Sequence, residues 1–144
     1  MPSVRLFLDV DDLQDIALLE QYIGESGLTI IFISRGYWIS RNCMREARAT
    51  VDEHKPSVLV HEADTAKGGI SWHDQLKECP SEMRFLVAQP LHPVVPWLRI
   101  SRFQLESLKQ ISRALLLATP KYCKLCGEQA ALDSRFVRPW RTCA

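Results

Sequence analysis

Side chains that could bind or react with a ligand recur at every third position between residues 34 and 46. The series supplies hydroxyl groups, a phenol, a thiol and a carboxylate, from Ser34, Tyr37, Ser40, Cys43 and Glu46. A cysteine nucleophile usually has a base beside it, and no histidine stands at a spacing that pairs with Cys43. Cys43 therefore fits a small buried side chain better than a nucleophile.

The segment that carries the series is predicted to be a strand, a loop and a helix. The β-branched run Thr29–Ile33 predicts a buried strand, and the polar stretch around Gly36 predicts a loop. Ser40 or Asn42 then supplies the N-cap of a helix that begins near Cys43. Ligands of open α/β sheets bind at the carboxyl ends of strands, so this junction is a candidate ligand site.

The rest of the chain alternates strands with helices. Apolar runs predict further strands at Val4–Val10, at Ser57–His61 and within Leu91–Ile100, the last an edge strand because it contains two prolines. The longest helix is predicted over Ser101–Ala118. This order implies an α/β fold, with a parallel sheet and helices on both faces. We expect a domain over residues 1–118 and an appended tail with little regular structure over residues 119–144.

Helical periodicity also predicts which side chains face the core. The helix after Ser40 should turn Met44, Ala47 and Val51 inward, and the last helix should turn in Phe103, Leu108, Ile111 and Leu115. An earlier helix is predicted around Leu13 and Ile23. The segment from Trp72 to Gln89, interrupted by Pro80, is expected to contain a short helix at best.

Composition limits the classes of function. The chain has 144 residues, of which 47% are hydrophobic and 24% charged, with a formal net charge of +1, as in a soluble globular domain. The near-neutral charge gives no reason to expect nucleic acid or a membrane as a partner. Without a signal peptide or an apolar run of about 20 residues, we expect a cytoplasmic protein. Five cysteines at irregular spacing do not form a secreted disulfide framework.

Several motifs follow one another in an order typical of a known family. They are Phe7–Ile16, Ile23–Ser26, Phe32–Tyr37, Ser40–Glu46, Val58–Asp64, Lys67–Gly69 and Val95–Leu105. From Leu6 to Leu117 the chain resembles the second half of a TIR (Toll/interleukin-1 receptor) domain, of the microbial and protist type. The resemblance implies a flavodoxin-like sheet that associates with other TIR domains in signal transduction, and a homo-oligomer.

The same resemblance implies an enzymatic role. Many TIR domains bind NAD+ and cleave its glycosidic bond, with a glutamate at the start of the helix after the third strand as the catalytic carboxylate. The matching position here is Glu46. Such a carboxylate could bind the ribose hydroxyls and stabilise an oxocarbenium-like cation, with no metal and no further cofactor. Ser34, Tyr37, Trp38 and Cys43 would line the NAD+ site, although both aromatic rings fit core packing equally well.

One departure from the family divides the functional hypotheses. The first strand and helix of a TIR domain have no counterpart here, and that strand lies at the centre of a flavodoxin-like sheet. Val4–Val10 would then pair directly with Thr29–Ile33 or leave an open edge that invites another chain. The alternatives are therefore an NAD+ nucleosidase that uses Glu46 and a non-catalytic interaction module or remnant.

Two weaker motifs suggest other chemistry. The strand that ends in Asp9 and Asp11 resembles the haloacid-dehalogenase phosphatases, in which the first carboxylate attacks phosphorus and the second acts as acid and base. The residues expected after that motif are absent, and the carboxylates fit helix capping. Cys123 and Cys126 form half of a zinc knuckle, with only Cys143 nearby as a further ligand, so we expect no metal site.

Overall fold

The computed structural model describes residues 18–88, 90 and 93–119. The predicted strand Val4–Val10, the residues Asp9 and Asp11, and the cysteines of the tail lie outside these ranges. The described elements are α2 (Leu19–Glu25), β1 (Thr29–Ile33), η2 (Tyr37–Ile39), α3 (Arg41–Asp52), β2 (Ser57–His61), η3 (Thr65–Lys67), α4 (Trp72–Glu78), η4 (Ser81–Met83), α5 (Arg84–Ala88), β3 (Val95–Pro96) and α6 (Ser101–Ala118).

The described strands form a parallel sheet in the order β1-β2-β3. Thr29 pairs with Ser57 and Ile33 with His61, so β1 and β2 match along their whole length. The predicted α/β class, with a parallel sheet, is confirmed. The edge strand expected within Leu91–Ile100 is shorter than predicted, since within its described part only Val95–Pro96 pairs with β2. Proline cannot donate to a ladder, which limits the pairing to this short segment.

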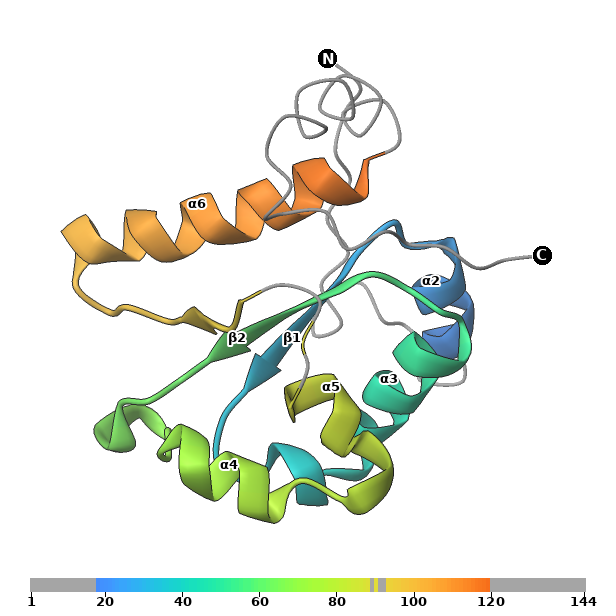
Figure 1. Cartoon of the computed structure of the whole chain (residues 1–144), viewed down its shortest axis with the longest axis horizontal. Helices are drawn as coiled ribbons and strands as arrows, with labels where there is room; N and C mark the ends of the chain where they lie inside the picture. The colour runs from blue at the N-terminus through green and yellow to red at the C-terminus, as the bar shows by residue number, and fades with distance from the viewer. Residues whose placement is uncertain (1–17, 89, 91–92, 120–144) are drawn as a thin grey trace.

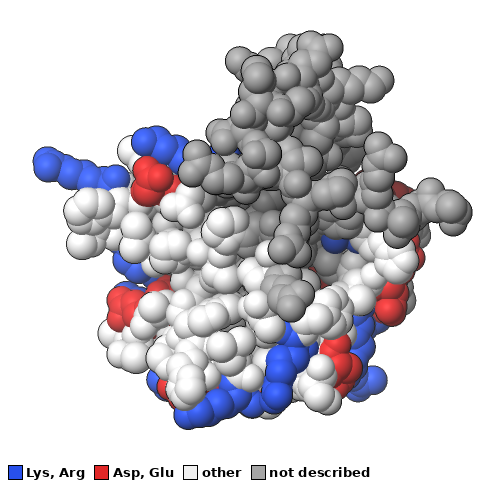
Figure 2. Space-filling model, viewed as in Figure 1, with Lys and Arg blue, Asp and Glu red and all other residues white. Residues whose placement is uncertain are grey.

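Helices cover the two faces of the sheet to different extents. Figure 1 shows α6 on one side of the strands and α3, α4 and α5 on the other. All five residues of β2 are buried, whereas in β1 only alternate residues are buried. In the view of Figure 2, charged side chains lie mainly around the rim of the molecule. The core therefore lies between the layers, with β2 at its centre.

The larger core cluster lies on the face covered by α3, α4 and α5. Its buried residues include Ile31, Ile33, Leu59, Met44 and Ala47, and Val51 packs against it. The predicted inward face of α3 is therefore confirmed. The smaller cluster lies under α6 and contains Val58, Val60, Val95 and Ala114. The two clusters alternate along β2 because successive side chains of a strand point to opposite faces.

The helices follow the predictions unevenly. Ser40 caps α3, since its hydroxyl accepts a hydrogen bond from the backbone N–H of Cys43 at 3.4 Å. The residues from Trp72 to Ala88 form two short helices, α4 and α5, rather than one at best. α6 has the predicted bounds, but its predicted inward face is wrong at Phe103 and Leu108, which are exposed, whereas Ser107 and Ala114 are buried.

Candidate functional site

The predicted series lies on three consecutive elements. Ser34 follows β1, Tyr37 and Trp38 belong to η2, and Cys43 and Glu46 lie on α3. The hydroxyl of Tyr37 donates to the backbone carbonyl of Cys43 at 3.2 Å, and this bond fastens η2 to the first turn of α3. The structure thus brings the aromatic pair and Cys43 together.

The two aromatic side chains pack inside the larger core cluster. Tyr37 is 5% exposed and Trp38 3%, and their rings meet edge to face with centroids 5.0 Å apart. A ring that stacks on a nucleotide must present a face to it, and both rings are enclosed in this conformation. The indole N–H of Trp38 has no hydrogen-bond partner among the described residues. The burial of the pair matches core packing, which was the alternative interpretation of these rings.

Glu46 lies on the side of α3 that faces away from the sheet. At about 100° per residue it stands about 200° from Met44, which is buried in the sheet-facing cluster. The far side of α3 packs on α2, where Leu19 and Ile23 form a third cluster with Ala49. Glu46 is nevertheless only partly exposed. On the helical wheel, Glu46 therefore lies between the α2-facing residue Ala49 and Cys43, which packs against the cluster that encloses Tyr37 and Trp38.

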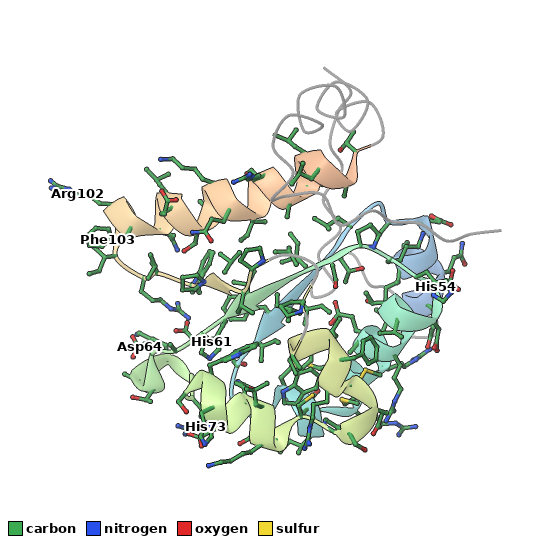
Figure 3. The ribbon with its side chains drawn as sticks, in the orientation of Figure 1. His54, His61, Asp64, His73, Arg102 and Phe103 are labelled. Carbon is green, nitrogen blue, oxygen red and sulfur yellow. The ribbon has the colours of Figure 1, made fainter. Side chains whose placement is uncertain are left out.

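A second group of functional side chains lies at the carboxyl end of β2. The Glu62 carboxylate is almost fully buried, and one of its oxygens accepts from Arg99 Nε at 2.7 Å. Its other oxygen accepts from the backbone N–H of Asp64 at 2.9 Å. His61 Nε2 lies 2.9 Å from the Ile70 carbonyl, and its ring meets that of Trp72 edge to face. Figure 3 shows His61, Asp64 and His73 at this end of the sheet.

The loop after Glu62 folds back tightly on itself and on the loop after β1. A Cβ added to Gly69 would stand 2.6 Å from the Glu62 carbonyl oxygen, so a larger residue would displace the backbone. The Gly69 N–H donates to the Asp64 carbonyl at 2.8 Å. Arg35 donates its backbone N–H to Gly68 and its guanidinium to the Gly69 carbonyl. The ends of β1 and β2 are thus linked through this loop.

This arrangement orders the carboxyl edge and leaves cations on its surface. Both oxygens of Glu62 are occupied, so the carboxylate holds Arg99 and the loop in place rather than reaching a ligand. Arg35 and Lys67 are exposed beside the same loop, and Arg99 is 44% exposed. Cations at the carboxyl edge of a parallel sheet favour an anionic ligand there.

The sequence interpretation missed the His61, Glu62 and Arg99 group. The available signal in the sequence was the polar pair His61–Glu62, which directly follows the apolar residues 58–60 of β2. Arg99 lies 37 positions after Glu62, and the pairing of β3 with β2 brings it near. Such a long-range ion pair has no periodic pattern in a single sequence.

The described residues show neither a metal site nor a membrane span. Within them, no group of three or more histidine, cysteine or acidic side chains could hold a metal ion. No helix in the same part of the chain is long and apolar enough to cross a membrane.

Comparisons with known proteins gave no match. No family model matches the chain, and neither a curated protein nor a solved structure matches it.

Proposed function

We propose that this chain is a TIR-like signalling module that acts by associating with other copies of itself. The observation that supports this proposal is the exposed apolar face of β1. Ile30 is 41% exposed and Phe32 39%, although both belong to a parallel sheet. Parallel sheets are normally covered on both faces, so these side chains favour a further protein surface over them.

The outer edge of β1 supports the same proposal. In the described part of the chain, β1 has one neighbouring strand, β2. An unpaired strand edge is a template for pairing with another chain. A second copy bound beside β1 would cover Ile30 and Phe32 and extend the sheet beyond the described strands.

Sedimentation velocity over a concentration series tests the proposed association. From about 5 µM to about 500 µM we expect the wild-type chain to shift from monomer to a larger species. Phe32→Lys should weaken the association about tenfold or more, because it places a charge in the apolar contact. Ile39→Lys is the control, since Ile39 is 86% exposed on η2, and it should associate like the wild type. A wild-type chain that stays monomeric throughout the series would contradict the proposal.

A second function, cleavage of NAD+ by Glu46, is favoured by two observations. Glu46 is partly buried rather than fully solvated, as a carboxylate that contacts a substrate would be. The cations Arg35 and Lys67 at the carboxyl edge suit the two phosphates of a dinucleotide. Loss of nicotinamide would leave a ribosyl cation, and the Glu46 carboxylate would stabilise that charge.

Nicotinamide release from NAD+ tests this second function. The wild-type chain, at high protein concentration, should release nicotinamide, and Glu46→Gln should lower the rate about 100-fold or more. Asp52→Asn is the control, because Asp52 is an exposed carboxylate at the end of the same helix, and it should keep the wild-type rate. Equal background release from all three proteins would exclude NAD+ cleavage by Glu46.

A further inference from the structure

α6 carries apolar side chains on two different sides. One side packs on the sheet through Ala114 and Ile111, and through the buried hydroxyl of Ser107, which donates to the Pro96 carbonyl at 2.6 Å. The other side exposes Leu105, Leu108 and Leu116, with exposed fractions of 58%, 43% and 45%. We call these three residues the outer leucine row. A surface helix that packs only against its own core would be polar at these positions.

The outer leucine row is compact enough to be one binding surface. At about 100° per residue its members fall within a sector of about 80°, and they span about 16 Å along the helix axis. Leu105 and Leu108 are three residues apart, so their side chains are neighbours on the helix surface. Leu115, partly buried, continues the apolar surface toward the sheet. This is the spacing with which one helix packs its apolar side chains against another.

Basic residues border the outer leucine row on its solvent side. Arg102, Lys109 and Arg113 stand about 40–80° from Leu105 around the helix. Glu106 is the only acidic residue of α6, and it pairs with Lys109 at 3.6 Å. α6 thus carries three basic residues and one acidic residue, a net charge of +2. Figure 3 shows Arg102 extending from the first turn of α6 away from the sheet.

We propose that the outer leucine row and its basic border bind an amphipathic helix of a partner protein that carries acidic residues beside its apolar face. The leucines supply the apolar contact, and the basic border selects the sign of the partner's charge. A second copy of α6 fits poorly, because it would bring two basic borders to one seam and like charges there repel. This proposal does not depend on the self-association of β1.

Fluorescence anisotropy with two designed helical peptides tests the proposed surface. Both peptides present leucines at positions i, i+3 and i+7, and the residues that flank the leucines are glutamate in one and lysine in the other. The wild-type chain should bind the glutamate peptide at least about tenfold more tightly than the lysine peptide, and added salt should reduce the difference. Leu105→Ser should weaken binding of the glutamate peptide, whereas Ile39→Ser, a change at an exposed residue of η2, should leave it unchanged.

A charge reversal distinguishes the proposed binding from nonspecific binding to apolar surface. In the double variant Arg102→Glu and Lys109→Glu, both sites are exposed, so the fold should persist and the preference should switch to the lysine peptide. Equal binding of both peptides, or no binding up to about 500 µM, would overturn the proposal. Two further results would also overturn it. If the wild-type chain binds anionic vesicles and Leu105→Ser abolishes that binding, the occupant is a membrane. If the chain forms a dimer that Leu105→Ser dissociates, the occupant is a second copy.

Discussion

The two faces of the sheet differ in how completely the described chain covers them. The face toward α3, α4 and α5 encloses Ile31, Ile33 and Leu59 with at most 1% of each exposed. The face toward α6 buries Val58 and Val60 of β2 but leaves Ile30 and Phe32 of β1 exposed. One face of the sheet is thus fully covered, whereas the other has exposed apolar side chains beside α6, the helix that covers the rest of it.

This difference suggests that one side of the sheet serves mainly to form the core and the other is available to bind a partner. On the closed face, even aromatic residues that sequence motifs favour as ligand contacts serve the core. On the α6 side of the sheet, exposed apolar groups remain on β1 and on the outer leucine row. Exposed apolar side chains grouped on one element mark interaction sites in soluble proteins. The two proposed protein-binding surfaces therefore lie on the α6 side, whereas the proposed NAD+ cleavage would use Glu46 on α3.

The largest expected effect on stability comes from comparing one side-chain truncation on each face of the sheet. Leu59→Ala removes a side chain from the centre of β2 and should lower the free energy of unfolding by about 2–5 kcal/mol. Phe32→Ala should cost only about 1 kcal/mol, because 39% of the Phe32 side chain is already exposed and the main loss is its edge-to-face contact with Trp97. Denaturant titration at low protein concentration measures both, with equal m values as the check on two-state unfolding. Equal losses would show that the Phe32 side chain is covered in solution.

Much of this two-faced fold could be predicted from local patterns. Thr29–Ile33 and Ser57–His61 are strands because they are short, apolar and β-branched, and Ser40 caps α3 through a local hydrogen bond. α6 shows where such reasoning fails. Its apolar residues lie on two sides, and the side that meets the sheet uses the small residues Ser107 and Ala114. Hydrophobicity alone selected Phe103 and Leu108, which face solvent.

The candidate site was less accessible to sequence reasoning than the fold. The family resemblance grouped Tyr37 and Cys43 in one predicted site, and in the structure the Tyr37 hydroxyl donates to the Cys43 carbonyl. Periodicity identified Met44, Ala47 and Val51 as the inward side of α3. It could not decide whether the Tyr37 ring belongs to the core or contacts a ligand. The contact between Glu62 and Arg99 requires the pairing of two strands, and a single sequence does not encode that register in any local pattern.

The next largest effect on stability concerns the ion pair between Glu62 and Arg99, which lies at the carboxyl edge of the sheet, between its two faces. Arg99→Met leaves the buried Glu62 carboxylate without its cation and should cost about 1–3 kcal/mol, less than for a fully buried pair because Arg99 is 44% exposed. Arg48→Met is the matched control, since Arg48 and Glu82 form an exposed pair that solvent screens, and it should leave the free energy of unfolding nearly unchanged. Adding Glu62→Gln to Arg99→Met should restore part of the loss. Equal effects of the two arginine substitutions would remove the structural role assigned to Glu62.

Substitutions of two buried polar residues, one on each side of the sheet, should change the free energy of unfolding in opposite directions. Gln75 on α4 is fully buried, and neither polar atom of its side chain has a hydrogen-bond partner among the described residues. Gln75→Met should therefore stabilise the fold by about 1 kcal/mol. Ser107 is equally buried, but its hydroxyl bonds to the backbone at Leu98 and Pro96, so Ser107→Ala should cost about 1–2 kcal/mol. If Gln75→Met destabilises the protein, that amide has a polar partner in solution.

The smallest effect is a difference in thiol reactivity within the closed face. Burial raises the pKa of the Cys79 thiol to about 11, whereas Cys43 in the same cluster is partly exposed. At pH 8 the Cys79 thiolate population should be about 100-fold smaller than at its ordinary pKa, so alkylation should be correspondingly slow. Peptide mapping after brief alkylation of the native protein should find Cys43 modified and Cys79 intact. Raising the pH toward 11, with circular dichroism confirming the fold, should increase the alkylation rate of Cys79. If Cys79 is alkylated at pH 8 as fast in the native protein as in urea, the elements that cover it must open in solution.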